Sequence, residues 1–355
     1  MQAATAAAQE PPPPPPPPAA PPPDAAGAIA TPPAAVVAPG PVEVLPVPPP
    51  AEPEPAAVAD DPGPLKLGAW GRVDLFISNG SSPAALNYPS GEGLDDTFST
   101  GEFEFHASGK VWKFVSLTLN LVASYTPDIT SSVTVMDGIV QLEPSPYFNV
   151  WLGRHLVSVD RANAAGPYFM SPWLYPGFGF ADGQVGAPRE GPYGRNDGVT
   201  VWGQVEGGLF KYFAGVFDLH LPGEAPLYTG RLTLSLLNPE PGFWGTATYH
   251  GMDVLGIGVG AQYKNDGQVT PGADAGDPPI DVQDYAEVNV DVLFEKNLGD
   301  AGVLDIEAAY YKFLADNSRT DAHWYGLVSY ILPADVGGGK LQPLVRVQQA
   351  LSNIE

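Results

Sequence analysis

The chain has 355 residues, with 16 Lys and Arg against 40 Asp and Glu, and it contains no cysteine. The missing cysteines exclude disulfides, thiolate metal sites and thiol nucleophiles, and the formal net charge of −24 argues against a nucleic-acid partner. No window holds the roughly 20 apolar residues of a membrane-spanning helix. A β-barrel would give no such signal, because it spans the membrane with short alternating strands. The first ten residues lack the basic and apolar parts of a signal peptide, so we expect no intact one there.

The first 64 residues differ in composition from the rest of the chain. They include eight consecutive prolines at 11–18, seven acidic residues and no Lys or Arg. Proline has no amide hydrogen and a fixed φ, so this segment can form neither a helix nor a sheet ladder. We therefore predict a disordered, polyproline II-like spacer over residues 1–64, followed by a folded domain over residues 65–355.

Apolar and polar residues alternate in segment after segment from Leu65 onward. Residues 115–124 read VSLTLNLVAS, and residues 286–292 read AEVNVDV. Strict alternation of this kind is typical of strands, and helical spacing is absent almost everywhere. We predict about fourteen strands, most of them about 9–13 residues long. They span residues 65–79, 99–109, 112–125, 132–143, 147–158, 197–206, 209–220, 228–237, 243–250, 254–264, 284–296, 302–314, 321–332 and 340–350.

These strands are about twice as long as those of an ordinary soluble sandwich. Very short turns, such as Gly109-Lys110 and Gly207-Gly208, join several of them, while other connections are long and rich in Gly, Pro, Asp and Asn. Short turns alternating with long loops, with aromatic residues near the strand ends, are typical of a transmembrane β-barrel. A soluble sandwich or propeller would explain one apolar face, but not acids on the other face of nearly every strand without a second apolar layer. We therefore predict an all-β protein with a transmembrane antiparallel β-barrel.

Several short segments resemble the phosphate-selective porin O/P family of Gram-negative outer membranes. The resemblance spans roughly residues 65–351 and implies a sixteen-stranded, homotrimeric barrel whose pore is narrowed by an inward-folded third loop. Our count stops about two strands short of sixteen, and the chain does not end on the aromatic residue usual in such barrels. Either the last hairpin is missing or the count is too low, and we expect the former because a barrel of this kind would have a closing hairpin. The segments are Asn149–His155, Pro167–Met170, Gly194–Thr200, Tyr212–Asp218, Tyr228–Leu232, Asn238-Pro239 and Leu341–Arg346.

We assign the polar face of the predicted strands to the lumen, and most of its charges are acidic. Acidic groups along a wide pore attract cations and exclude anions, which favours a weak cation preference although the family name suggests phosphate. Alternatively, these charges have no role in selectivity, because any water-filled channel needs a polar lining. The predicted pore-lining residues are Arg72, Asp74, Glu102, Glu104, Arg231, Glu287, Asp291, Asp305, Glu307 and Arg346.

Residues 159–196 form the longest gap between predicted strands of the barrel. A loop of this length is either functional or disordered. Its place after the fifth predicted strand matches the constriction loop of the porin family, so we predict that Arg161, Arg189 and Arg195 line a constriction. An ordinary extracellular loop is the alternative.

Few residues indicate other chemistry. His106 and Ser108 share one face of a predicted strand, but a hydrolase would also need a third orienting group and an apolar substrate groove, and the sequence reveals neither. Gly256–Gly260 has alternate glycines without a following helix, so we predict a strand rather than a nucleotide-binding loop. The histidines show no metal-ligand spacing. We therefore expect no enzymatic activity, no cofactor and no metal.

The sequence thus predicts an outer-membrane porin for the passive diffusion of small hydrophilic solutes or ions, with its N-terminal spacer in the periplasm. One alternative is a phosphate- or anion-selective porin. Another is a structural anchor that binds the cell wall through the Pro-rich arm, and a hydrolase on the barrel wall is the remaining hypothesis. The expected partners are outer-membrane lipid, the solutes and further copies of the chain in a trimer.

Overall fold

The computed structural model divides the chain into two compact units, Met1–Ala56 and Ala57–Glu355. All described residues belong to the second unit, so the predicted spacer lies outside the described residues except for Gly63 and Pro64. The structure describes residues 63–78, 95–124, 132–166, 169–172, 194–219, 225–270, 281–315, 320–337 and 339–352.

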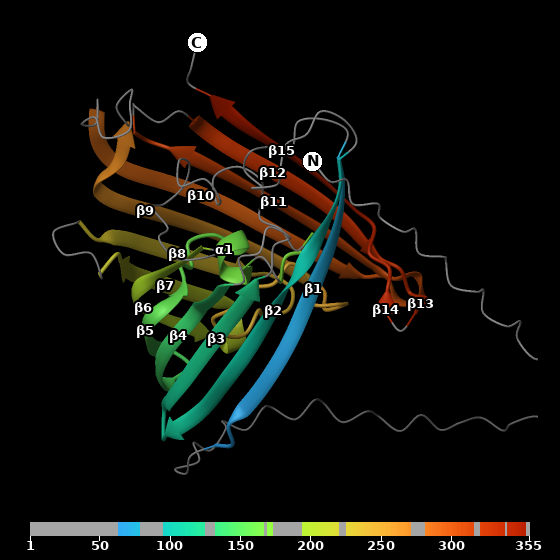
Figure 1. Ribbon diagram of the computed structural model, residues 1–355, viewed down its shortest axis with the longest axis horizontal. Coiled ribbons are helices and arrows are strands. Elements are labelled where there is room, and N and C mark those ends of the chain that lie inside the picture. The colour runs from blue at the N-terminus through green and yellow to red at the C-terminus, as the bar shows by residue number, and fades with distance from the viewer. Residues whose placement is uncertain are drawn as a thin grey trace, which may run out of the picture. The chain divides into compact units, whose positions relative to one another are not determined.

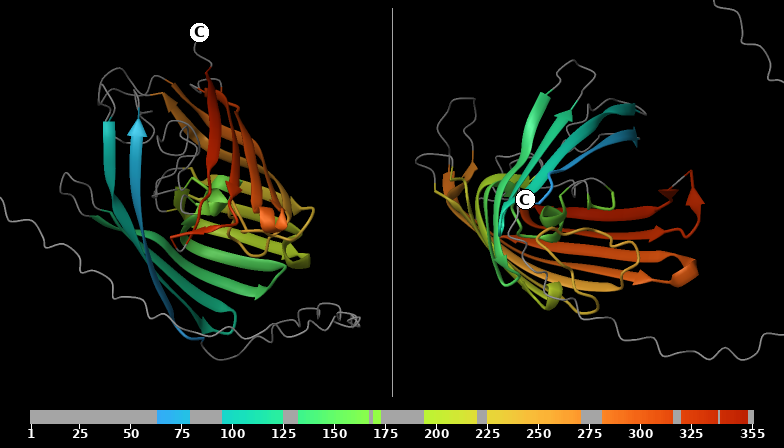
Figure 2. Two further views of the ribbon diagram at one scale, coloured as in Figure 1. Left: turned by 90° about the vertical axis from the view of Figure 1, so that its right-hand side faces the viewer. Right: turned by 90° about the horizontal axis from the view of Figure 1, so that it is seen from below.

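One antiparallel sheet of 13 strands makes up most of the described part (Figure 1). Each strand pairs with its neighbour in the order of the sheet, and the sheet curls so that α1 (Arg161–Ala165) lies on its concave side (Figure 2). The strands are β1 (Lys66–Ser78), β2 (Asp95–Trp112), β3 (Val115–Ser124), β4 (Ser132–Ser145), β5 (Phe148–Leu156), β6 (Arg195–Val205), β7 (Phe210–Phe217), β8 (Leu227–Ser235), β9 (Val254–Thr270), β10 (Asp281–Asn297), β11 (Val303–Phe313), β12 (Thr320–Ile331) and β15 (Leu344–Ser352).

The remaining described elements are short. The 3-10 turns η4 (Glu206–Gly208) and η5 (Gly299–Ala301) lie in strand connections, and β13 (Asp335–Val336) pairs with β14 (Gly339–Lys340) between β12 and β15. Among the described helices, none has the length and apolar character needed to cross a membrane.

The predicted all-β class is confirmed, with one error in the strand count. Thirteen of the fourteen predicted strands overlap a strand of the sheet. The prediction of a strand at 243–250 is wrong, because these residues form an irregular segment that packs against the inside of the sheet. Phe243 and Ala247 are each 2% exposed, and the ring of Phe243 stacks on that of Trp151 with centroids 3.8 Å apart. Phe243 and Ala247 are spaced like residues on one face of a strand, although they belong to a loop that fills the interior.

The two faces of the sheet have opposite character. In β10, Val288 and Val290 are each 43% exposed, whereas Glu287 and Asp291 are each 2% exposed. The same alternation runs through β8, β9, β11 and β12. A water-soluble sheet would bury its apolar face and expose its charges. The reversed arrangement is the one that a β-barrel in lipid requires.

The connections differ between the two ends of the sheet. At one end, the β2–β3, β4–β5, β6–β7 and β10–β11 connections are two to five residues long. The connection between β8 and β9, residues 236–253, starts at this same end but is much longer, and we call it the β8–β9 loop. The long β5–β6 connection starts at the opposite end. Its described first part, residues 157–166, contains α1, and we call it the α1 loop.

Lipid contact of the outer face can be tested by placing a charge at two depths of one strand. Val290 lies in the middle of β10 and Val282 near its beginning, and each is 43% exposed. We expect Val290→Lys to lower the free energy of unfolding in lipid vesicles by about 2–4 kcal/mol, and Val282→Lys by about 0–1 kcal/mol. Equal effects of the two substitutions in urea titrations would contradict a membrane-spanning β10.

Candidate functional site

Two loops that start at opposite ends of the sheet meet inside it. The amide of Gly245 in the β8–β9 loop donates a hydrogen bond to the carbonyl oxygen of Ala164 at 2.9 Å, and the amide of Ala247 donates to that of Phe169, also at 2.9 Å. The sequence forms α1 at this point because Asp160 caps it, its side chain accepting from the Asn163 amide at 2.9 Å. The meeting of the two loops divides the interior of the sheet.

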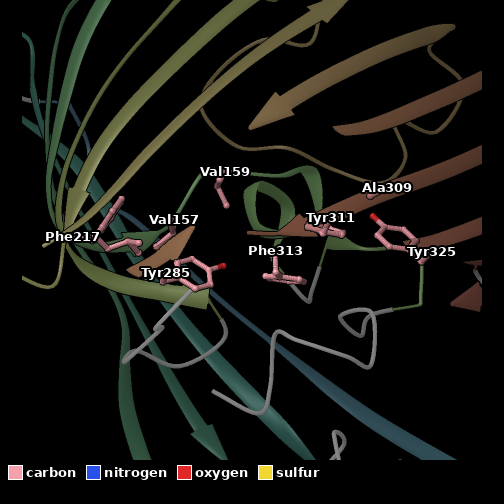
Figure 3. Packing of buried hydrophobic residues seen from close by; sticks show 9 residues of the cluster. Val157, Val159, Phe217, Tyr285, Ala309, Tyr311, Phe313 and Tyr325 are labelled. Atoms are coloured by element: carbon pink, nitrogen blue, oxygen red, sulfur yellow. The ribbon is translucent and has the colours of Figure 1, made fainter. Parts of the chain in front are cut away.

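Apolar contacts fix both loops to the inner wall. Val157 and Val159 of the α1 loop belong to a buried cluster that includes Phe217 of β7 and Tyr285 of β10 (Figure 3). Phe243 of the β8–β9 loop belongs to a separate cluster of aromatic residues from β5, β6 and β7. The loops are therefore packed parts of the fold, because these apolar side chains are buried against strands of the inner face.

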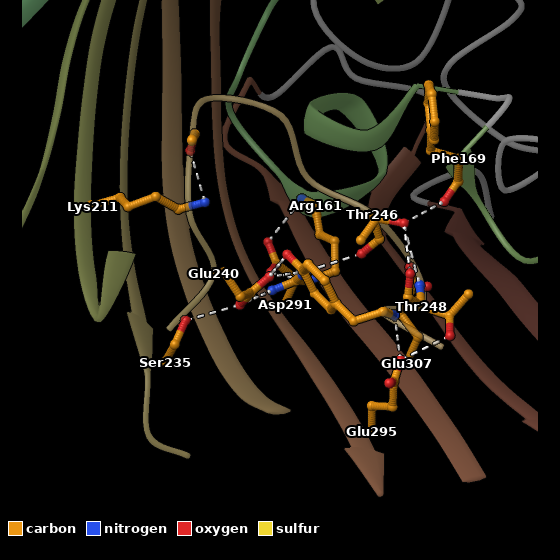
Figure 4. A network of polar contacts seen from close by, with 12 residues as sticks. Arg161, Phe169, Lys211, Ser235, Glu240, Thr246, Thr248, Asp291, Glu295 and Glu307 are labelled. Atoms are coloured by element: carbon orange, nitrogen blue, oxygen red, sulfur yellow. Dashed lines mark hydrogen bonds and ion pairs between the residues drawn. The ribbon is translucent and has the colours of Figure 1, made fainter. Parts of the chain in front are cut away.

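A buried ion pair joins the two loops. Arg161 of α1 donates to both carboxylate oxygens of Glu240 in the β8–β9 loop, at 2.8 and 2.9 Å, and the two side chains are 4% and 2% exposed (Figure 4). The hydroxyl groups of Ser235 and Tyr249 donate to the same carboxylate at 3.0 and 2.8 Å. These additional bonds matter because a buried charge is tolerated only when it is well paired and hydrogen-bonded.

The same network extends to the sheet through Asp291 of β10. Arg231 of β8 donates to both of its oxygens, at 2.5 and 2.9 Å, and the backbone amide of Arg161 donates to it at 3.1 Å. Arg231 also donates to the carbonyl oxygen of Val159 at 3.2 Å. Asp291 thereby connects the α1 loop to two strands that are separated by β9.

The alternate glycines of β9 make room for this network. A Cβ atom at Gly256 would lie 2.0 Å from Oε1 of Glu240, and one at Gly258 would lie 2.3 Å from Nη2 of Arg231. A Cβ atom at Gly260 would lie 1.9 Å from the carbonyl oxygen of Val159. The prediction of a strand at Gly256–Gly260 is confirmed, and its glycines are explained by the side chains and backbone that approach this strand.

The charge states of Glu240 and Tyr249 in the β8–β9 loop follow from burial and from the ion pair with Arg161. Burial alone would raise the pKa of Glu240, but the charge and hydrogen bonds of Arg161, with Lys211 and Tyr249, outweigh burial and hold that pKa well below its usual range. Burial raises the pKa of Tyr249 above its usual value, and the neighbouring Glu240 carboxylate raises it further. Glu240 is therefore ionised and Tyr249 neutral at ordinary pH.

A cavity of about 1230 Å³ lies between the loops and the inner face of β1–β4. The strands contribute mainly polar side chains to its lining. The β8–β9 loop contributes the aromatic residues Trp244 and Tyr249, and Phe169, beyond the α1 loop, adds a third aromatic ring. Its lining includes, from the strands and the start of β6, Lys66, Glu104, His106, Ser108, Lys110, Ser116, Asn120, Asp137 and Arg195, and on the opposite side Phe169, Trp244 and Tyr249.

Most of the predicted pore-lining residues face the interior, but few of them border this cavity. Glu104 does so, while Arg231 and Asp291 bind each other beneath the loops. Arg346 is half-buried on β15. The side chains of Arg72, Asp74 and Glu102 lie outside the part that the structure describes. The predicted residues buried on the inner face are Glu104, Arg231, Glu287, Asp291, Asp305 and Glu307.

The predicted constriction residues occupy different places. Arg161 is 3% exposed and holds the loops together rather than facing the cavity. Arg195, at the start of β6, borders the cavity and donates from Nε and Nη2 to the two oxygens of Asp137, at 3.1 and 3.2 Å. Arg189 lies outside the described residues. Whether Arg195 limits passage of solutes stays a prediction.

Sequence reasoning missed Glu240 and Asp137. Glu240 lies between two prolines, in a stretch that reads as a surface turn. Asp137 lies in β4 next to a shift of register, where Asn120 of β3 pairs with Asp137 but Leu121 pairs with Val135. A lone acid in the apolar run Val-Met-Asp-Gly-Ile-Val was the available signal, because such a charge needs a buried partner.

Within the described ranges, no group of three or more His, Asp or Glu residues could hold a metal ion.

Comparison with known proteins supports the fold and no narrower relationship. No family model and no curated protein matches the chain. OmpTdeltaL8, a loop-deletion mutant of the outer membrane protein OmpT of Vibrio cholerae, aligns with a TM-score of 0.50 at 13% identity, covering 82% of this chain and 83% of that chain. OmpT expressed in the outer membrane of Vibrio cholerae gives 0.48 at 13% identity over 81% and 76%. A mutant of the Rh. blastica porin gives 0.34 at 12% identity over 81% and 100%. The first alignment shows that the chain has the β-barrel fold of outer-membrane proteins.

The contribution of the buried ion pair to stability can be measured by replacing one charged side chain with a neutral one of the same shape. We expect Glu240→Gln to lower the free energy of unfolding by about 3–5 kcal/mol, because it leaves the buried Arg161 without its main counter-charge. The matched control is Asp335→Asn, which alters an exposed pair with Lys340 at 3.9 Å, and we expect it to cost less than about 1 kcal/mol. Similar losses in the two variants would contradict a structural role of the buried pair.

Acid should weaken the same interaction. Because the folded state holds the pKa of Glu240 below its unfolded value, the stability that Glu240 contributes is fully present above about pH 4.3 and is lost as the pH falls towards the folded pKa. Between pH 5 and pH 3, we therefore expect the wild type to lose more unfolding free energy than Glu240→Gln. Parallel pH profiles of the two proteins would show that Glu240 makes no such contribution.

Proposed function

We propose that the protein is an outer-membrane porin through which small hydrophilic solutes and ions diffuse passively. The observation that carries the proposal is a cavity of about 1230 Å³ with a polar strand wall, inside a sheet whose outer face is apolar. A wet passage needs polar groups inside, and contact with lipid needs apolar groups outside. The outer-membrane location belongs to the same proposal.

The buried charges support a weak preference for cations. Among the described residues, ten carboxylates are buried against five Lys and Arg side chains. Four of these five bases, Arg161, Arg195, Arg231 and Lys264, already form ion pairs with acids. The inner side therefore keeps an excess of negative charge, which favours cations in a water-filled pore. The buried carboxylates are Glu104, Asp137, Asp160, Asp218, Glu240, Glu287, Asp291, Glu295, Asp305 and Glu307.

An anion-selective pore, as in the phosphate-selective porin family, is the second candidate. Lys66, Lys110 and Arg195 border the cavity, and an anion pathway needs several basic groups along the lumen. Against this, Arg195 is bound to Asp137, and Glu104 lines the same cavity. We therefore place anion selectivity second.

The assembly and the N-terminal arm complete the proposal. We expect a homotrimer, as the porin resemblance implies, with residues 1–64 as a periplasmic tether. In the alternative, the barrel conducts little and serves as an anchor that binds the cell wall through this arm. Deleting residues 1–64 should leave conductance intact if the protein is a porin. The anchor hypothesis instead predicts that the deletion abolishes pull-down with isolated peptidoglycan.

Ion selectivity can be tested by the reversal potential across a planar bilayer under a KCl gradient. We expect a modest cation-selective potential with the full-length protein, and a shift towards zero in Glu104→Gln, which removes an acid from the cavity wall. The control is Glu206→Gln in the exposed turn η4, which should not shift the potential. An anion-selective potential would contradict the proposed preference, and folded protein without conductance would contradict the porin itself.

A further inference from the structure

The cavity wall carries a chain of side-chain hydrogen bonds with a fixed order of donors and acceptors. A water-filled pore needs polar side chains, but it does not need them in such an order. Ser108 and His106 lie two residues apart on β2, and Oγ of Ser108 is 3.0 Å from Nε2 of His106. Nδ1 of His106 is 2.5 Å from Oδ1 of Asn120, which stands directly opposite it on β3. A serine, a histidine and a side-chain oxygen thus form a continuous line that borders the cavity.

The partners at the far end of this line fix the positions of its protons. Nδ2 of Asn120 donates to Oδ2 of Asp137 at 2.7 Å. Because an ionised carboxylate only accepts hydrogen bonds, the amide oxygen of Asn120 must be the atom that faces His106. That oxygen also only accepts, so Nδ1 of His106 carries a proton, and in the neutral imidazole Nε2 then presents its lone pair to the Ser108 hydroxyl.

Asp137 is itself held in place. It is fully buried, at 0% exposure, and receives two hydrogen bonds from Arg195, at 3.1 and 3.2 Å. Its ion pair with Arg195 compensates the buried charge and prevents the carboxylate from turning away from Asn120. The orientation of His106 therefore depends on residues from three further strands, β3, β4 and β6.

We propose that Ser108, His106 and Asn120 form a hydrolytic site for small carboxylic esters that enter the cavity. Ser108 acts as nucleophile and His106 as general base, while Asn120 is a positioning residue that acts through His106. The proposal goes beyond passive diffusion and supplies the third group that the sequence left unidentified. The apolar surface that a substrate needs comes from Trp244 of the β8–β9 loop and from Phe169, which are 37% and 63% exposed and border the same cavity.

The reaction balances with water as the only co-substrate. Oγ of Ser108 attacks the ester carbonyl carbon while its proton passes to Nε2 of His106. The bond from that carbon to the alcohol oxygen then breaks, and the alcohol leaves with the proton from Nε2. Water next attacks the acyl-serine, gives a proton to Nε2, and releases the carboxylic acid as the Oγ–C bond breaks and Ser108 regains its proton.

Positive side chains take the place of the backbone amides that usually stabilise the oxyanion. The amides around Ser108 belong to the β-ladder with β1 and β3, so they are not aimed into the cavity. Lys66 stands directly opposite Ser108 on β1, Lys110 lies two residues along β2, and both border the cavity. An ammonium group next to the carbonyl carbon would stabilise the negative charge that develops there.

The test uses the refolded full-length protein in lipid vesicles, with p-nitrophenyl acetate as substrate and a fluorophosphonate probe that modifies activated serines. We expect the probe to modify Ser108, as mapped by mass spectrometry, and Ser108→Ala to abolish both modification and hydrolysis. His106→Ala should lower kcat at least about 100-fold, as loss of a general base does. Asn120→Ala should lower kcat with little change in KM, because it acts on the orientation of His106 and not on substrate binding.

The control is Ser116→Ala, since Ser116 borders the same cavity from β3 but has no place in the hydrogen-bonded line. This variant should hydrolyse the ester like the wild type. Planar-bilayer conductance of every variant shows that the barrel is folded, and it reports on the porin proposal separately. Hydrolysis that persists in Ser108→Ala, or equal modification of Ser108 and Ser116, would overturn the proposal and reduce the line to a polar lining.

Discussion

The interior of this sheet depends on one buried ion pair, between Arg161 in α1 and Glu240 in the β8–β9 loop. The two residues are 79 positions apart in the chain and belong to loops that start at opposite ends of the sheet. Removing two charges from water costs several kcal/mol per ion, so the pair can exist only because Ser235, Tyr249 and Asp291 supply further hydrogen bonds and charge. The glycines of β9 leave the space that this network occupies.

The position of the open space follows from that arrangement. The loops pack on the strands from β5 to β11, through the aromatic contacts of Phe243, the capping residue Asp160 and the Arg231–Asp291 pair. The interior volume that remains lies against β1–β4, where polar side chains face aromatic ones across the cavity. Both the proposed diffusion path and the proposed hydrolytic site use this same wall. A solute would therefore contact His106 and Ser108 on its way through the cavity.

Alternation in the sequence is sufficient to predict the sheet and its faces, because the sheet has one lipid-compatible face and one polar face. Glu287 and Asp291 could thus be assigned to the interior directly. The segment at 243–250 misled the same reasoning, since Phe243, Ala247 and Tyr249 of this interior loop fall at alternate positions, as apolar residues of a strand do. The ion pairs of Glu240 and Asp137 could not be predicted, because their arginine partners lie 79 and 58 positions away and only the curl of the sheet brings them together.

The meeting of the two loops can be tested most directly by a disulfide. A Cβ atom at Gly245 would lie 3.3 Å from Cβ of Ala164, close to the separation found in disulfides, and the chain has no cysteine of its own. Ala164→Cys combined with Gly245→Cys should form a cross-link under mild oxidation in the folded protein, detected by peptide mass spectrometry. Ala164→Cys combined with Asp300→Cys, which lies in the exposed turn η5, should not. Folded protein that fails to cross-link the first pair, or that cross-links both pairs equally, would contradict two loops joined inside the sheet.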